Sequence, residues 1–103
     1  MPKYVLDTCV EGELWGIWHF IAQDNPDAAS RVVEATYDTF KLLAANPGLG
    51  RLRRLRNPRL REVRSRRVSG FENYIIFYRS IEGGIQVIHV YHGARDIDAL
   101  FGE

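Results

Sequence analysis

The chain has 103 residues and a mass of 11.9 kDa, which is room for one domain, residues 1–103, and not for two. Apolar residues make up 46% and charged residues 26%, proportions typical of a folded protein, so a disordered chain is excluded. The net charge of +1 hides an uneven distribution, because residues 51–67 hold nine arginines and a single acid, Glu62. We interpret this arginine block, residues 51–67, as a binding surface for an acidic partner.

The first half of the sequence predicts a short strand and two helices. Tyr4-Val5-Leu6 is a β-prone run. The first helix is predicted between residues 11 and 24, because apolar residues recur there at three- and four-residue steps: Leu14, Ile17, Trp18 and Ile21. A second helix is predicted from residue 26 to residue 46, with Asn25 as its N-cap and Pro47-Gly48 as its stop. The short connection makes the two helices an antiparallel hairpin.

The second half predicts an antiparallel meander that follows an irregular, Gly- and Arg-rich stretch over residues 48–61. The three strands are expected at residues 62–68, 74–80 and 85–92, with turns at 69–73 and 82–84. The element order is therefore β-α-α-β-β-β, and the fold class is α+β. The helical hairpin is expected to pack on one face of a sheet that contains the meander.

Alternation along the strands predicts which side chains lie on each face of the sheet. In the first meander strand, Val63 indicates the side that faces the helices. In the last strand, the helix-packed side is expected to hold Ile88, Val90 and His92, and the open side Val87. Glu62 is also expected on the open side. That open face would gather Arg64, Arg66, Arg79, His89 and Tyr91.

The sequence predicts neither a metal site nor a cofactor. His89 and His92 stand three apart on a predicted strand, so they point to opposite faces and do not share an ion. Cys9 and His19 offer no ligand spacing, and we expect Cys9 to be a small buried residue. The turn at residues 48–51 lacks the Gly-Lys-Ser/Thr ending of a phosphate loop.

The location of the protein follows from features that the chain lacks. A single cysteine forms no internal disulfide, which fits a reducing compartment. No apolar run reaches the ~20 residues of a membrane span, and the first residues lack the basic and apolar regions of a secretory signal. We therefore expect a cytoplasmic protein with no membrane contact.

Two classes of function fit the charged residues. Arginine stabilises a phosphate but stays protonated, so cleavage of RNA also needs a proton mover, for which His89, Tyr91 and Glu62 are the candidates. Binding of an acidic partner needs only the positive charges of the arginines. The sequence leaves open whether that partner is nucleic acid in direct contact with the chain. Trp15 and Trp18 are expected to lie in or beside the core, or, if exposed, to mark a groove for another chain.

Five motifs in chain order resemble the RelE/ParE superfamily, the toxins of type II toxin-antitoxin systems, and most closely ParE. They lie at residues 17–22, 25–29, 46–51, 74–79 and 92–96. The resemblance implies a bacterial toxin that inhibits DNA gyrase and is neutralised by a cognate ParD-like antitoxin. The antitoxin would be acidic, partly disordered when free, and joined to the toxin in a hetero-oligomer.

The alternative is a RelE-like interferase that cuts messenger RNA on the ribosome. RelE nucleases use lysines in the region matching residues 51–64, whereas Lys3 and Lys41 lie elsewhere, so the resemblance favours a ParE-like inhibitor over an enzyme. For an interferase the catalytic set would be Arg64, Arg66, Arg79, His89 and Tyr91. For a ParE-like toxin the residues expected to bind the antitoxin or target are Arg51, Arg53, Arg54, Arg56, Arg61, Arg64, Arg66, Arg79, Trp15 and Trp18.

Overall fold

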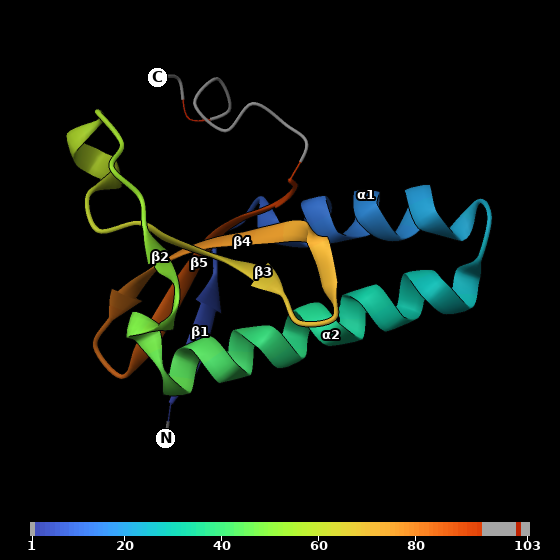
Figure 1. Ribbon diagram of the computed structural model, residues 1–103, viewed down its shortest axis with the longest axis horizontal. Coiled ribbons are helices and arrows are strands. Elements are labelled where there is room, and N and C mark those ends of the chain that lie inside the picture. The colour runs from blue at the N-terminus through green and yellow to red at the C-terminus, as the bar shows by residue number, and fades with distance from the viewer. Residues whose placement is uncertain (1, 94–100, 102–103) are drawn as a thin grey trace.

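Two antiparallel helices lie on one face of a five-stranded sheet in the computed structural model (Figure 1). The structure describes residues 2–93 and residue 101, so residues 94–96 of the last motif lie outside the described part of the chain. The elements are β1 (Lys3–Leu6), α1 (Val10–Ala22), α2 (Pro26–Ala45), β2 (Arg51–Leu52), β3 (Arg64–Val68), β4 (Phe71–Ile81) and β5 (Gly84–His92), with short 3-10 turns η1 (Pro47–Leu49) and η2 (Pro58–Leu60).

The strands are ordered β1-β5-β4-β3-β2, with β1 parallel to β5 and every other pair antiparallel. The expected order of helices, meander and first strand is confirmed. The stretch at residues 48–61 was expected to be irregular, but it contributes β2 as a fifth strand. The turn after β3 is also shorter than expected, because β4 already begins at Phe71. Gly70 makes this turn with a φ of 82°, a conformation that favours glycine.

The start of α2 follows the capping rule. The side-chain oxygen of Asn25 accepts a hydrogen bond from the Ala28 N–H at 3.0 Å, and Pro26 occupies the first helical position. At the other end, the Asn46 side-chain amide donates to the Leu42 carbonyl at 3.0 Å. The predicted second helix is thus confirmed to within one residue. No helix in the described residues is long and apolar enough to cross a membrane.

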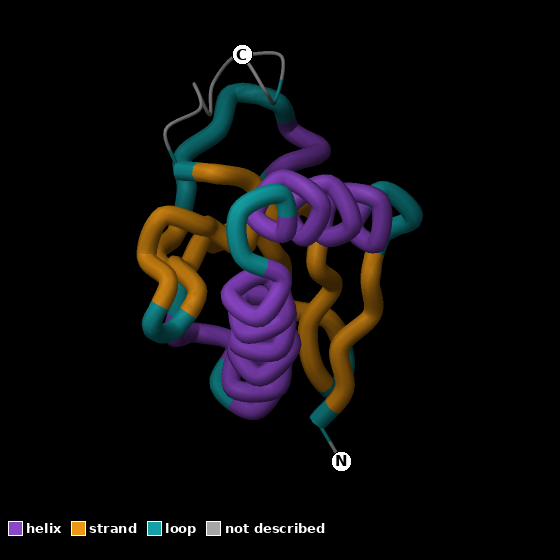
Figure 2. Tube along the Cα trace, turned by 90° about the vertical axis from the view of Figure 1, so that its right-hand side faces the viewer, coloured by secondary structure: helices purple, strands orange, loops and turns teal. Residues whose placement is uncertain are grey.

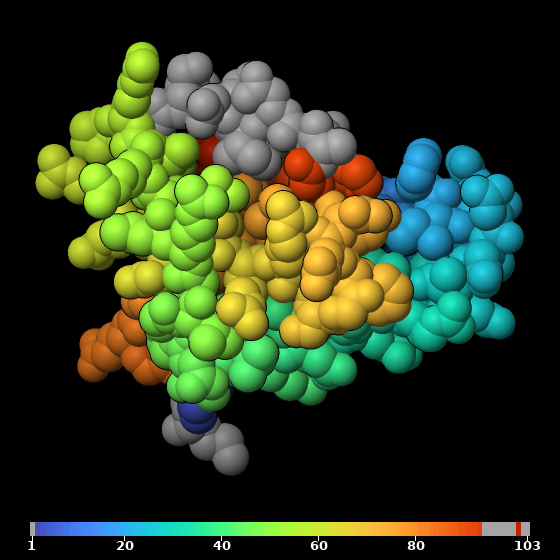
Figure 3. All heavy atoms as spheres, in the orientation of Figure 1, coloured from blue at the N-terminus to red at the C-terminus, as the bar shows by residue number. Residues whose placement is uncertain are grey.

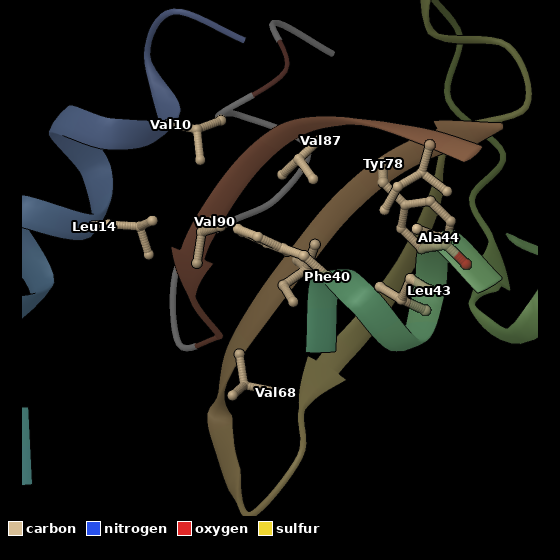
Figure 4. Packing of buried hydrophobic residues seen from close by; sticks show 11 residues of the cluster. Val10, Leu14, Phe40, Leu43, Ala44, Val68, Tyr78, Val87 and Val90 are labelled. Carbon is tan, nitrogen blue, oxygen red and sulfur yellow. The ribbon is translucent and has the colours of Figure 1, made fainter. Parts of the chain in front are cut away.

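The main core lies between the helices and the sheet. Figure 4 shows Val10 and Leu14 of α1 facing β5, and Phe40 and Leu43 of α2 below the sheet. Tyr78 of β4 is also fully buried in this cluster. Figure 2, turned so that the connection between α1 and α2 faces the viewer, shows both helices in front of the strands. The end of the hairpin therefore extends beyond the sheet.

A second apolar cluster covers the opposite face of the sheet. Leu55 and Leu60 of the arginine block, together with Phe101, pack over this cluster. Its buried members are Val63, Ile75, Phe77, Ile88 and Tyr91. The expectation of an open sheet face is therefore wrong, because both faces are covered and strands buried on both faces lose a clear polar–apolar alternation.

The expected sides of the first meander strand are reversed. Arg64 pairs with Tyr78 and Arg66 pairs with Ile76, so both arginines lie on the side of the sheet that faces the helices. Val63 belongs to the second cluster instead. The strand begins at Arg64 and not at residue 62, because Glu62 adopts a φ of 62° and turns the chain immediately before it.

A β-bulge accounts for the errors in the last strand. The pairing between β4 and β5 shifts by one residue at Ile88, so Ile88 joins the second cluster and Val87 joins the core under the helices, opposite to expectation. Beyond the bulge the alternation resumes. The expected sides are confirmed for His89, Val90, Tyr91 and His92.

Gly84 provides a test of the β1–β5 pairing. A Cβ atom at this position would overlap the backbone carbonyl of Lys3, its partner in the parallel ladder. We expect Gly84→Ala to lower the free energy of unfolding by about 3 kcal/mol, because backbone atoms must move to relieve the overlap. Urea unfolding measures this loss. Gly12→Ala, a change at an open helical position, is expected to raise stability by about 0.5–1 kcal/mol, and equal effects of the two variants would contradict the register.

Candidate functional site

The outer edge of the sheet is only partly paired. β2 contributes two residues, which pair with Arg64 and Ser65, so within the described residues the outer side of β3 from Arg66 to Val68 has no strand partner. A groove of about 500 Å³, which we call the edge groove, runs beside this segment. Glu72 is its one acidic lining residue among those described. Its basic lining residues are Arg51, Arg53, Arg66 and Arg67.

Four arginines of the block and of β4 are held by the protein itself. Arg53 donates from Nε to the Ser65 hydroxyl at 2.8 Å and lies over the ring of Phe77. The remaining three donate to backbone carbonyls: Arg64 to Gly50, Arg67 to Glu72 and Arg79 to Arg59. These side chains therefore fix the arginine block onto the sheet.

The other arginines of the block present their charge to solvent. They are Arg51, Arg54, Arg56, Arg59, Arg61 and Arg66, all of them exposed. In Figure 3 the block, yellow-green to yellow, occupies the left and centre of the face toward the viewer. Exposed guanidinium groups at this density attract acidic groups and bind carboxylates in pairs of hydrogen bonds. Some arginines of the block thus hold it on the sheet through hydrogen bonds, and the others are available to a partner.

A buried tyrosine anchors the beginning of the block. The Tyr78 hydroxyl accepts a hydrogen bond from the Gly50 N–H at 2.7 Å and donates to the Pro47 carbonyl at 2.8 Å. Burial raises the pKa of the Tyr78 phenol, and the Gly50 N–H with the charges of Arg64 and Arg66 offsets part of this rise. A side chain at Gly50 would overlap the Tyr78 ring, so glycine is needed for this approach.

The helical hairpin carries a second groove. Trp15 is 61% exposed, which contradicts the expectation of a core position, whereas Trp18 is half-buried and donates to the Ser30 hydroxyl at 3.3 Å. The two indole rings lie 5.8 Å apart and line a groove of about 290 Å³ with Val33 and Tyr37. This tryptophan groove is mainly apolar, with Glu11 as its one charged lining residue among those described, in contrast to the basic edge groove.

The residues proposed for RNA cleavage do not form one cluster. Arg64 and Arg66 lie on the helix side of the sheet, and Arg79, His89 and Tyr91 lie on the other side. Tyr91 is buried against Phe77, with its ring stacked on that of His89. The geometry therefore does not place the five side chains around a common phosphate.

Sequence reasoning missed a cluster at the start of α1. Cys9 is exposed, contrary to expectation, and its Sγ lies 3.5 Å from Nδ1 of His89. The same Nδ1 lies 2.8 Å from Oε2 of Glu13. Partial burial, followed by the negative charge of Glu13, raises the pKa of the Cys9 thiol. The only signal in the sequence was the four-residue spacing of Cys9 and Glu13, which places them on one helix face.

The fold and its edge together define a small α+β protein that presents a basic, incompletely paired sheet edge and a separate groove on its helical hairpin. The chain belongs to the ParE toxin family: the matching family, described as "ParE toxin of type II toxin-antitoxin system, parDE", covers residues 4–97. The fold is similar to that of a solved chain described as "Chromosomal ParDE TA system from P. aeruginosa". The TM-score is 0.69 at 18% identity, with 89% of this chain and 96% of that chain covered. No curated protein matches the sequence.

Proposed function

We propose that this chain is the toxin of a type II toxin-antitoxin pair, that it inhibits DNA gyrase, and that an acidic ParD-like antitoxin neutralises it. The edge groove is the observation that carries the proposal. It combines four arginines with the unpaired outer side of β3. An extended segment can pair with such an edge through its backbone while its acidic side chains meet the arginines. Inhibition of gyrase would take place in the bacterial cytoplasm.

One segment of the opposite edge, where β5 extends beyond β1, is covered in a way that the β3 edge is not. Beyond β1, the outer side of β5 is covered by α1, and the Glu13 carboxylate accepts a hydrogen bond from the Val90 N–H at 3.0 Å. Proteins commonly block free sheet edges in this way, because an unblocked edge recruits other strands. The β3 edge has no comparable cover among the described residues. The β5 segment beyond β1 is therefore closed and the β3 segment from Arg66 to Val68 is open, while β1, like β3, has no strand partner on its outer side among the described residues.

The antitoxin is expected to be partly disordered when free and to order on the toxin, forming a hetero-oligomer. A flexible acidic segment can reach both the edge groove and the tryptophan groove, where Trp15 offers a large exposed apolar surface. The exposed arginines of the block would steer its encounter. Tight neutralisation then needs no catalytic residue on either chain.

Support for gyrase as the target comes from membership of the ParE family together with the separation of the cleavage candidates on two faces of the sheet. We expect the purified chain to inhibit supercoiling by gyrase and to trap cleaved DNA. Relaxation by a type I topoisomerase serves as the control and is expected to be unchanged. Unimpaired supercoiling without trapped cleavage would contradict gyrase as the target.

The same samples distinguish the RelE-like alternative. If the chain were a messenger RNA interferase, mapping of a translated message would find new cut sites at toxic concentrations. We expect the message to stay intact, because Arg64 and Arg66 are separated by the sheet from Arg79 and His89. Adding the antitoxin encoded beside the gene is expected to restore supercoiling in proportion to the toxin that it binds.

A further inference from the structure

We infer that Cys9, Glu13 and His89 form a binding site for a divalent transition-metal ion of the zinc type. Their ligand atoms, Sγ, a carboxylate oxygen and Nδ1, all lie within 4.8 Å of one another. Thiolate, imidazole and carboxylate are the protein ligands that zinc takes. A thiolate and an imidazole in the same set disfavour Mg²⁺ and Ca²⁺, which prefer oxygen ligands alone.

Two of the three distances between ligand atoms are close to those around a tetrahedral ion. With bond lengths of about 2.3 Å to sulfur and about 2.0 Å to nitrogen and oxygen, tetrahedral ligands stand about 3.5 Å apart for S and N and about 3.3 Å for N and O. The observed Cys9–His89 distance is 3.5 Å, and the Glu13–His89 distance is 2.8 Å. The Glu13–His89 distance therefore has to lengthen by about half an ångström, and the Cys9–Glu13 distance, which is at most 4.8 Å, has to become about 3.5 Å, as the carboxylate exchanges its hydrogen bond to the ring for a bond to the ion.

A backbone N–H and a neighbouring aromatic ring hold two of the ligands in place. Glu13 uses its other oxygen, Oε1, to accept the Val90 N–H at 3.0 Å, which leaves Oε2 directed at His89. The His89 ring is stacked on Tyr91, with centroids 4.6 Å apart. Contacts of this kind orient the ligands of metal sites and raise their affinity. Cys9 is exposed, so an ion can enter from solvent and take water as its fourth ligand.

A nucleophilic Cys–His–Glu triad is the competing interpretation of these three residues. In such a triad one ring nitrogen faces the thiol and the other faces the carboxylate. Here Nδ1 of His89 faces both Cys9 and Glu13, which is the geometry of ligands around a common centre. The geometry thus favours metal binding, in which Cys9 would act as a thiolate and release its proton to solvent.

Cobalt provides the most direct probe of the site. The full chain, freed of metal with a chelator, is expected to bind one Co²⁺ and to develop visible bands of a tetrahedral ion and a near-ultraviolet thiolate-to-cobalt band. Zn²⁺ should displace the Co²⁺ and raise Tm by at least ~5 °C at saturation. Failure to bind one equivalent of Co²⁺, or binding without a thiolate band, would overturn the proposal.

Substitutions at the three proposed ligands test whether each of them binds the metal ion. Cys9→Ser, at an exposed position, is expected to remove the thiolate band, and Glu13→Gln and His89→Asn to weaken binding at least ~10-fold. Glu11→Gln on the same helix is the matched control and is expected to leave binding unchanged. If circular dichroism shows that Glu13→Gln lowers the folded fraction of the protein, the cobalt spectrum of Cys9→Ser alone decides whether the metal site exists. An unchanged spectrum in Cys9→Ser would overturn the site.

Discussion

Replacing Tyr78 by phenylalanine is expected to lower the free energy of unfolding by about 2–4 kcal/mol. The change removes the hydroxyl that joins the Gly50 N–H to the Pro47 carbonyl and leaves both groups without this partner, and each unsatisfied buried group costs about 1–3 kcal/mol. Because Gly50 immediately precedes the arginine block, the same variant should loosen the edge groove. Urea unfolding measures the stability, and proteolysis between residues 51 and 61 measures the loosening.

Tyr74→Phe is the matched control for this variant, because Tyr74 lies on the same strand and the same side of the sheet but is only half-buried. Its expected effect is within about 0.5 kcal/mol. A loss in Tyr78→Phe no larger than that of Tyr74→Phe would contradict the anchoring role of the hydroxyl.

The pH dependence of stability provides a second readout for Tyr78. Burial raises the pKa of the folded phenol above its ordinary value of 10.0. The folded chain therefore keeps a proton that the unfolded chain releases, so the free energy of unfolding falls as the pH rises above about 10. This fall should be shallower in Tyr78→Phe. Some of the slope should remain, because burial also raises the pKa values of Tyr37 and Tyr74.

Reversing two charges in the edge groove is expected to weaken antitoxin binding strongly. In Arg51→Glu/Arg66→Glu both changes fall on exposed groove residues, and neither side chain belongs to the four that hold the block on the sheet. We expect the dissociation constant to rise at least ~30-fold, about 2 kcal/mol, through lost attraction and new repulsion of an acidic segment. Calorimetry of the folded variant with the antitoxin measures the change.

Arg31→Glu/Lys41→Glu is the control for this experiment, because it changes the net charge equally at exposed positions on α2. Its dissociation constant is expected to change less than ~3-fold at physiological ionic strength, since screening weakens distant charges. Equal losses in the two double variants would show that only the net charge matters. Arg64→Ala is less suitable, because Arg64 also supports the Gly50 carbonyl.

The sequence was sufficient for the helices and the meander because each has a local signal. The Asn25-Pro26 cap and the apolar stripe of α2 predicted that helix to within one residue. The resemblance to ParE was drawn from motifs that span the chain, and the family match over residues 4–97 confirms it. Local periodicity and capping depend on neighbouring residues alone, so they can be read without knowledge of the tertiary structure.

Features that depend on distant contacts could not be predicted in this way. The β-bulge at Ile88 reverses the sides of two residues without any mark in the sequence. The second core exists because Leu55 and Leu60, in a stretch dominated by arginine, fold back over the sheet. The Cys9–Glu13–His89 cluster joins residues about 80 positions apart, which one-dimensional spacing rules do not detect.

Hydrogen exchange of the toxin with and without its antitoxin tests the account's central claim, that an acidic segment pairs with the free edge of β3. We expect antitoxin binding to slow exchange within Arg66–Val68, since a new strand supplies partners for the outer backbone groups there. Exchange that stays unchanged at these residues in a saturated complex would contradict the claim, even if the surface around Trp15 became protected.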